Sequence, residues 1–310
     1  MRNAFIRGLT ALAERDQRVV LLTGDLGFKI FDEFAARFPG RFYNAGVAEA
    51  NMIGVAAGLA LGGLKPFVYS IVPFATLRCL EQIRDDICYQ EAPVTVVGVG
   101  GGYSYGPNGA THHSLEDIAV MRCLPNMTVV CPGDPMEAEL GTLATGSHAG
   151  PLYLRLGRAG DPKVHEAAVP FSIGSAIVVR NGTDCALIST GGILPVAVAA
   201  AKLLESEGIG CRVVSMHTVK PLDEALLHRC AEEYGAIFTI EEHSLVGGLG
   251  SAVGEWLAAS GARCLLRSYG AADRFSHLCG SQEYFRQMQG LTAEKIARRV
   301  HEALKEMVRC

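Results

Sequence analysis

The stretch Gly46-Val-Ala-Glu-Ala-Asn-Met-Ile-Gly-Val-Ala-Ala-Gly-Leu-Ala-Leu61 consists almost entirely of small or apolar residues. It predicts a closely packed helix that carries Glu49 in its first turn. An acidic residue in a first turn suits the helix dipole, which is one explanation for its presence. Because burying a carboxylate without a partner costs free energy, Glu49 is expected to lie near solvent, to be paired, or to hold a proton.

The composition is that of an ordinary globular protein. Its 310 residues suggest about two domains, and 49% hydrophobic against 19% charged residues exclude a disordered chain. A net charge of -4 without a basic stripe argues against a nucleic-acid partner. The sequence shows neither a signal peptide nor a bilayer-spanning apolar stretch, which predicts no membrane association. The 10 cysteines form no Cys-x-x-Cys pair, so we expect buried thiols in a reducing cytoplasm, without disulfides or a zinc site.

Short apolar, β-branched runs recur along the chain and alternate with helical patterns. The runs cover residues 19–22, 67–69, 94–97, 128–130, 152–154, 185–188, 211–214 and 236–240. Such runs are typical of parallel strands buried on both faces, so the sequence predicts an α/β fold with parallel sheets. A polar, turn-rich stretch at 157–163 predicts a boundary between two domains, 1–165 and 166–310. A final core-packing helix is expected to begin at Thr292.

The loop Tyr103-Ser-Tyr-Gly-Pro-Asn-Gly-Ala-Thr-His-His-Ser-Leu-Glu-Asp117 follows a predicted strand. Loops at the carboxyl ends of parallel strands form the ligand crevice of α/β sheets. Adjacent side chains point in different directions, so at most one of His112 and His113 is expected to face a substrate. The structural alternative is that Thr111 caps a helix and one histidine bonds to backbone. A metal site would need further ligands at fitting spacing, and the sequence shows none.

Charged residues also follow other predicted strands. Arg155 and Arg158 close the last strand of the first half, where paired arginines can bind phosphate or carboxylate through two hydrogen bonds. Solvated ion pairs explain these arginines equally well. Asp25 ends the first strand, either at the edge of the crevice or as a turn residue. The glycine-rich stretches 98–103 and 247–254 lack the dinucleotide-binding spacing and predict tight turns instead.

Taken together and in order, these motifs resemble the C-terminal half of transketolase. The matching segments are Gly24-Asp-Leu26, Gly46-Val-Ala-Glu-Ala-Asn-Met52, Glu81-Gln-Ile-Arg84, Thr111-His112 with Glu116-Asp117, Leu124-Pro-Asn126, Ser189-Thr-Gly-Gly192 and Glu241-Glu-His-Ser-Leu-Val-Gly-Gly-Leu-Gly-Ser251. They cover nearly the whole chain at the family's usual spacings. The resemblance implies a pyrimidine-binding thiamine diphosphate domain, followed by the small transketolase C-terminal domain, in an enzyme that transfers a two-carbon ketol unit between sugars.

The resemblance also assigns roles to residues. Glu49 matches the glutamate that hydrogen-bonds a ring nitrogen of the cofactor's aminopyrimidine and shares a proton there. His112 matches the histidine that contacts the sugar and its oxygens, so Glu49 and His112 are the expected catalytic residues. Asp25 matches an aspartate near the cofactor and the subunit interface. Tyr69 and Phe74 lie in the segment that builds the pyrimidine pocket, so both are expected to bind the cofactor.

Further positions bear on the substrate. Arg158 resembles the arginine that binds a sugar phosphate. Asn108 stands where transketolases usually carry an aspartate that reads a ketose hydroxyl, and an amide can still hydrogen-bond. Lys29 replaces a small hydroxyl residue, and Gly100 falls where many members carry a phosphate-side histidine. With His112, the residues Lys29, Asn108 and Arg158 are the expected substrate contacts, and the departures predict an altered preference among sugar phosphates.

The diphosphate-binding half of the family is missing. No Gly-Asp-Gly with a downstream Asn exists to bind diphosphate through magnesium, and the chain begins almost directly at the pyrimidine domain. The resemblance therefore implies a naturally separate subunit, whose partner polypeptide holds the diphosphate of thiamine diphosphate and the Mg²⁺ ion. It further implies an active site formed between chains in an α2β2 heterotetramer, and a chain that is inactive alone.

Three alternatives remain open. One is the beta subunit of a 2-oxo acid dehydrogenase, a separate chain of similar size with the same two domains. Another is a fragment of deoxyxylulose phosphate synthase, which is similar in the segment 68–70. The last is a non-catalytic partner of the same fold, because Val72 and Ala75 stand where the family usually packs two aromatics on the pyrimidine.

Overall fold

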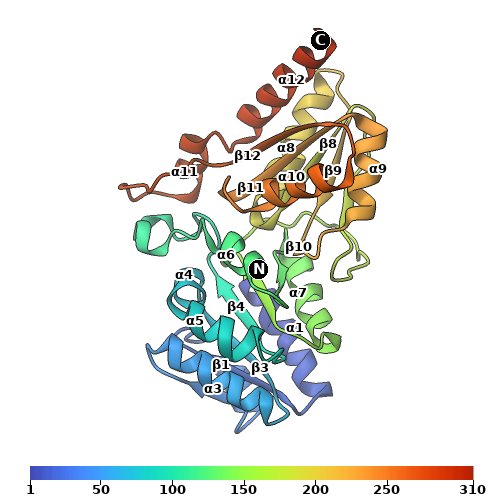
Figure 1. The fold of residues 1–310 in the computed structure, drawn as a ribbon. Helices are drawn as coiled ribbons and strands as arrows, with labels where there is room; N and C mark the ends of the chain where they lie inside the picture. The colour runs from blue at the N-terminus through green and yellow to red at the C-terminus, as the bar shows by residue number, and fades with distance from the viewer. Residues whose placement is uncertain (310) are drawn as a thin grey trace.

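The computed structural model describes residues 1–309 and consists of two lobes, each built around one β-sheet (Figure 1). The strands are β1 (Val19–Thr23), β2 (Phe42–Asn44), β3 (Lys65–Ile71), β4 (Thr95–Val99), β5 (Thr128–Val130), β6 (Leu152–Leu156), β7 (Ile177–Arg180), β8 (Cys185–Thr190), β9 (Cys211–Ser215), β10 (Thr218–Lys220), β11 (Ala236–Ser244) and β12 (Leu265–Ala271). The seven-stranded sheet has the order β10-β5-β6-β4-β3-β1-β2, and the five-stranded sheet has the order β12-β11-β8-β9-β7. Most pairs are parallel, so the predicted α/β fold is confirmed.

Helices lie between most of the strands. The α-helices are α1 (Arg2–Arg15), α2 (Asp32–Arg37), α3 (Glu49–Leu61), α4 (Val72–Ala75), α5 (Leu80–Gln82), α6 (Asp117–Cys123), α7 (Pro135–Ala144), α8 (Leu194–Ser206), α9 (Glu224–Tyr234), α10 (Leu249–Ser260), α11 (Gln282–Gln289) and α12 (Ala293–Arg309). The shorter helical turns are η1 (Leu77–Cys79), η2 (Ile83–Cys88), η3 (Gly106–Asn108), η4 (Ala110–His112), η5 (Thr145–Ser147) and η6 (Gly191–Ile193). Thr292 caps α12 as predicted, since its hydroxyl accepts a hydrogen bond from the Lys295 amide at 3.4 Å. Within residues 1–309, no helix combines the length and apolar character needed to cross a bilayer.

All eight strands predicted from apolar runs are present, but four others were missed. The missed strands are β2, β7, β10 and β12. The most consequential is β10, which follows β9 in the chain but pairs antiparallel with β5 of the other sheet, with Thr218 opposite Val130. The seven-stranded sheet is therefore completed by a segment from the second half of the sequence.

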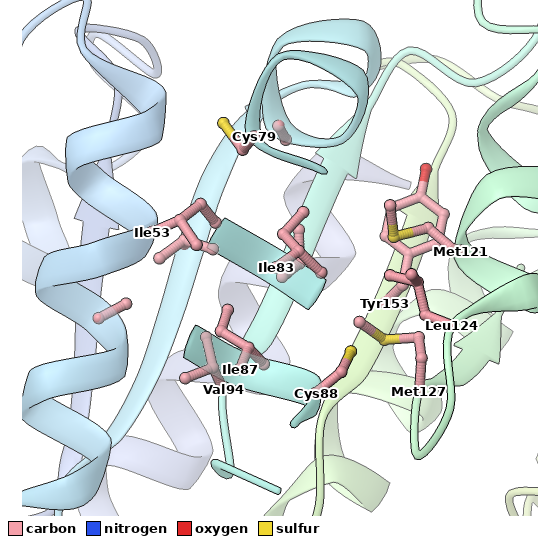
Figure 2. Packing of buried hydrophobic residues seen from close by; sticks show 14 of the residues in the cluster. Ile53, Cys79, Ile83, Ile87, Cys88, Val94, Met121, Leu124, Met127 and Tyr153 are labelled. Atoms are coloured by element: carbon pink, nitrogen blue, oxygen red, sulfur yellow. The ribbon is translucent and has the colours of Figure 1, made fainter. Parts of the chain in front are cut away.

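Both faces of the seven-stranded sheet are buried. On one face, α3, the segment 72–88 and α6 cover a core that includes Ile53, Ile83 and Met121 (Figure 2). On the other face, α1 and α7 cover a second core. Because side chains alternate along a strand, the β3 neighbours Val68 and Tyr69 belong to different cores. This alternation decides which β3 side chains can reach the candidate site.

The five-stranded sheet packs α8 and α12 on one face and α9 and α10 on the other. The carboxyl ends of its strands face the first lobe. Directly after β8, the Gly191 amide donates to the Cys131 carbonyl at 3.0 Å. Near the end of β11, the Glu242 carbonyl accepts a hydrogen bond from Arg155 of β6 at 3.1 Å. The strand-end loops of the two lobes therefore meet, and polar side chains gather there.

Candidate active site

Glu49 is the first residue of α3 and is 2% exposed. Gly24, directly after β1, makes room for its side chain, because a Cβ built on Gly24 would lie 3.2 Å from Cγ of Glu49. Any larger residue at position 24 would press on the carboxylate. The structure thus excludes the explanation that Glu49 lies near solvent, and leaves the question of its partners.

Two side chains hydrogen-bond Glu49. The Ser70 hydroxyl donates to Oε1 at 3.1 Å, and Arg78 Nη1 donates to Oε2 at 2.6 Å. Glu49 is therefore paired, but Arg78 is 45% exposed and contributes only one contact. Each carboxylate oxygen can accept two hydrogen bonds, so Glu49 retains acceptor capacity for a further group. Neither partner was identified from the sequence.

Arg78 connects Glu49 to two other predicted site residues. Its guanidinium carbon lies 4.4 Å from the centre of the Phe74 ring, a cation–π contact. The other contact of Phe74 is with His112, whose ring packs edge-on with the centroids 5.1 Å apart. The structure therefore brings Glu49, Phe74 and His112 into one connected group, although they are distant in the sequence.

His112 and His113 lie in different surroundings, as predicted. His112 is half-buried, and its Nδ1 lies 3.0 Å from the Thr111 hydroxyl. Burial lowers the pKa of His112, so the ring is neutral at neutral pH and can donate or accept hydrogen bonds. His113 is buried between the rings of Tyr103 and Phe285, at centroid distances of 5.1 and 4.8 Å. Only His112 is left for a substrate role.

Tyr69 does not contact this group. Its ring lies in the other core, stacked on Phe5 at 5.8 Å and edge-on to Phe31 at 4.9 Å. Because the next residue, Ser70, points to the opposite face of β3, the hydroxyl of Ser70 reaches Glu49 instead. The prediction that Tyr69 binds the cofactor therefore places the wrong face of β3 at the site, and any influence of Tyr69 is indirect.

Asp25 lies in the turn after β1 and is hydrogen-bonded to Asn44, which precedes the turn that leads into α3. It has a left-handed backbone with φ of 58°, and its Oδ1 accepts a hydrogen bond from the Asn44 amide at 2.9 Å. Asn44 in turn accepts from the backbone amides of Asp25 and Gly46, at 3.1 and 3.0 Å. This network fixes the approach to Glu49. Lys29, also left-handed with φ of 67°, is exposed and takes no part in it.

The remaining predicted substrate residues are exposed at the lobe junction. Asn108 ends η3, and Arg158 follows β6. Tyr105 lies close to Gly100, since a Cβ built on Gly100 would come within 2.3 Å of the tyrosine ring. The aromatic ring therefore occupies the space that a side chain on residue 100 would need. The sequence motif alone did not reveal this arrangement.

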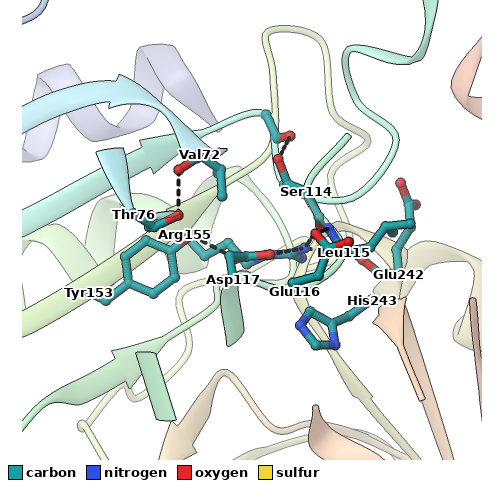
Figure 3. A network of polar contacts seen from close by, with 12 residues as sticks. Val72, Thr76, Ser114, Leu115, Glu116, Asp117, Tyr153, Arg155, Glu242 and His243 are labelled. Carbon is teal, nitrogen blue, oxygen red and sulfur yellow. Dashed lines mark hydrogen bonds and ion pairs between the residues drawn. The ribbon is translucent and has the colours of Figure 1, made fainter. Parts of the chain in front are cut away.

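Asp117 and Arg155 form a second acid–arginine pair, buried beneath the loop that carries His112 (Figure 3). Arg155 donates from Nε and Nη2 to the two carboxylate oxygens, at 2.7 and 3.2 Å. The Tyr153 hydroxyl adds a further bond to Asp117 at 2.7 Å. Arg155 also reaches the Ser114 carbonyl at 2.8 Å, which ties the loop to β6. The sequence suggested phosphate binding or solvated ion pairs for Arg155, but its 4% exposure excludes both.

Within residues 1–309, one group has the geometry of a metal site, namely Asp134, Glu137 and His165. Its oxygens already have protein partners. Asp134 accepts hydrogen bonds from the backbone amides of Glu137 and His165, at 2.9 and 3.0 Å. Glu137 accepts from Ser215 and approaches His165 Nε2 at 2.7 Å, which raises the pKa of that histidine. These three residues therefore form a set of hydrogen bonds that holds the segment between the lobes in place.

Comparisons with known proteins agree with the sequence motifs. Residues 1–160 match the pyrimidine-binding domain of transketolase, and residues 174–296 match the transketolase C-terminal domain. A subunit of a 6-deoxy-6-sulfo-D-fructose transketolase, from Clostridium sp. (strain MSTE9), is 39% identical, over 97% of this chain and 94% of that protein. A subunit of the apulose-4-phosphate transketolase of Phocaeicola vulgatus is 39% identical over 83% of each chain. A solved split-gene transketolase, described as an inactive β4 tetramer, superposes with a TM-score of 0.91 at 38% identity and 98% coverage of both chains.

Proposed function

This chain belongs to the transketolase family, and we propose that it is the pyrimidine-binding subunit of a two-chain transketolase that transfers glycolaldehyde units between sugar phosphates or related sugars. The observation that carries the proposal is the buried Glu49 carboxylate, which retains acceptor capacity beside Arg78, Phe74 and His112. The relatives support a transketolase subunit over the beta subunit of a 2-oxo acid dehydrogenase.

The site fits the pyrimidine half of thiamine diphosphate. Glu49 lies in a largely dry environment, while its partner Arg78 is half-exposed. When bound, the cofactor supplies an electron sink for the cleavage of a carbon–carbon bond next to a carbonyl. Glu49 would hold a proton at the carboxylate oxygen, and Phe74 would offer its ring as an apolar wall. Asp25 would act through the turn that leads into α3.

The substrate is assigned to the lobe junction. His112, neutral because burial lowers its pKa, would hydrogen-bond sugar oxygens. Asn108 would bind a hydroxyl through its amide, and Arg158 would pair with an anionic group on the sugar. The exposed Lys29 would add positive charge at the entrance. The two relatives act on a sulfosugar and a sugar phosphate by name, which supports an anionic sugar as the substrate class here.

A second polypeptide would complete the site. The names of both relatives describe them as subunits of transketolases. We therefore assign the diphosphate and Mg²⁺ to a partner chain, in an α2β2 assembly. The described cysteines are free, which suits a reducing compartment such as the cytoplasm.

The test is to co-express this chain with a matching diphosphate-domain subunit and to assay ketol transfer with thiamine diphosphate and Mg²⁺. Transfer is expected from the mixture and from neither chain alone. Decarboxylation of a 2-oxo acid without transfer would instead favour the dehydrogenase subunit. A stable complex that catalyses neither reaction would favour a non-catalytic partner, and turnover by this chain alone would refute the two-chain site.

A further inference from the structure

One helix of the second lobe packs directly against the loop that carries the substrate residues. Phe285 of α11 is fully buried and stacks on Tyr103 with the ring centroids 4.7 Å apart. The His113 ring packs edge-on with Phe285, at a centroid distance of 4.8 Å. The loop 103–113 therefore rests on a side chain of the second lobe, and does not rest only on its own sheet.

Glu242, at the carboxyl end of β11, is the polar centre of this contact. Its Oε1 accepts hydrogen bonds from the Tyr103 amide at 2.6 Å and from the Gln282 side chain at 2.9 Å. Its Oε2 accepts from Arg286 Nε at 2.5 Å. One carboxylate that is 4% exposed thus joins the start of the loop to two residues of α11.

Two glycines allow the carboxylate and the loop to approach each other. A Cβ on Gly102 would lie 2.4 Å from Oε1 of Glu242, so any side chain at this position would displace the carboxylate. A Cβ on Gly106 would lie 2.5 Å from the carbonyl of Gly280, whose amide donates to the Gly106 carbonyl at 3.3 Å. This close contact lies at the start of η3, and the chain continues from there to Asn108 and His112.

We propose that Glu242, together with Arg286 and Gln282, is a positioning residue that holds the loop 103–113 and thereby sets where Asn108 and His112 meet the sugar. The second lobe then takes part in substrate binding through α11, although none of these three side chains touches the substrate. The inference deepens the proposed function and rests on it. Glu49 is held by Ser70 and Arg78, and neither residue belongs to this contact.

The kinetic test uses the assembled two-chain enzyme with Glu242→Gln. Glutamine keeps the shape but loses the charge-assisted bond to Arg286 and presents a donor where an acceptor is needed. We expect the KM for the sugar to rise about tenfold or more, while kcat and the affinity for thiamine diphosphate change less than about twofold. Arg286→Gln is expected to act similarly, and the double variant is expected to be no worse than Glu242→Gln alone.

The matched control is Glu255→Gln. Glu255 forms another ion pair between the lobes, with Arg122, which joins α10 to α6 and not to the loop 103–113. If both variants raise KM equally, the effect reflects the docking of the lobes and the positioning role is wrong. An unchanged KM in Glu242→Gln, or fully additive effects of Glu242 and Arg286, would also overturn the proposal.

A second measurement is independent of the reaction. Amide hydrogen exchange of the full chain is expected to accelerate about tenfold at residues 102–114 in Glu242→Gln, with little change around α3. If the wild-type assembly catalyses no ketol transfer, the proposed function fails while the exchange result still tests the contact. If exchange at 102–114 is unchanged in the variant, Glu242 does not hold the loop and the inference fails.

Discussion

Glu49 and Asp117 are both buried carboxylates paired with an arginine, but their surroundings differ. Asp117 receives two bonds from Arg155 and one from Tyr153, and the arginine is buried with it. Glu49 accepts two bonds, one from Ser70 and one from Arg78, and the Arg78 side chain is nearly half exposed. Both members of the first pair are therefore buried, whereas the arginine of the second pair reaches solvent.

The difference separates an ion pair that stabilises the fold from one whose carboxylate is proposed to take part in catalysis. An ion pair in which the arginine and the carboxylate are both buried cannot be reached by a ligand, so it serves to fix the loop that Arg155 binds. A buried carboxylate with a spare lone pair at a strand-end crevice can bind a further donor. Burial and an arginine partner alone would have ranked the two acids equally, and the exposure of the arginine distinguishes them.

The largest expected effect is on the stability that the buried pair of Asp117 and Arg155 contributes. Asp117→Asn leaves the Arg155 charge buried without a counterion, so the free energy of unfolding should fall by about 3–5 kcal/mol. Urea unfolding of the chain measures this loss. The control is Glu139→Gln, which breaks the exposed pair with Arg7 and should cost about 0–1 kcal/mol. Equal losses in the two variants would contradict the distinction.

Glu49→Gln is expected to reduce the transfer rate strongly and to change the stability of the chain little. The transfer rate of the assembled enzyme should fall about 10²–10⁴-fold, because the amide cannot hold the proton that the carboxylate holds. The free energy of unfolding should change by less than about 1 kcal/mol, since Arg78 can turn to solvent. Glu224→Gln, exposed on α9, is the control for both measurements. Retained transfer in Glu49→Gln would refute its catalytic role.

The region around Asp117 should also respond to acid. His243 accepts a hydrogen bond from the Ala119 amide of α6 at 3.3 Å, and burial lowers its pKa from 6.5 to about 4. The unfolded chain therefore binds the proton more readily, so this contribution is complete above pH 6.5 and is lost as the pH falls toward 4. The expected loss is about 3 kcal/mol.

Urea unfolding between pH 7 and 5 measures the slope. Burial also lowers the pKa of His112, His113, His148 and His217, which adds to the slope. The raised pKa values of His165, Glu116 and Glu241 oppose it. The informative comparison is therefore between the wild type and His243→Gln, whose slope should be shallower. An identical slope in the two proteins would rule out the contribution of His243.

The smallest expected effect concerns Arg78, the half-exposed partner of Glu49. Arg78→Lys keeps the positive charge but loses the planar group that stacks on Phe74, so the transfer rate should fall about tenfold. Arg84→Lys, in an exposed pair with Asp85, is the control and should leave the rate unchanged. If Arg78→Lys matches the control, the stack on Phe74 does not organise the site.

The sequence predicted the scaffold well, because buried parallel strands and an apolar helix leave a local signal. The helix that begins with Glu49 and the cap at Thr292 are examples. The strand β10 left no such signal, since three residues pair with a strand that lies far earlier in the chain. Local sequence patterns predict local structure, but they do not reveal strand pairings between distant segments.

The site was predicted in part. Glu49, Phe74 and His112 are brought together, but their link Arg78 lies in the irregular segment between α4 and α5, where no period indicates the direction of a side chain. Tyr69 was predicted to face the site but lies on the other face of β3, for a related reason. A strand buried on both faces is apolar throughout, so its sequence does not tell which residues face the site.

The position of β10 also has a consequence for synthesis. As the chain leaves the ribosome, β5 appears long before β10, and β7, β8 and β9 of the other sheet are made in between. Until then, the outer edge of β5 exposes unpaired backbone groups that can recruit another strand. The first lobe of a nascent chain is therefore an unfinished sheet, and the second lobe supplies the strand that completes it.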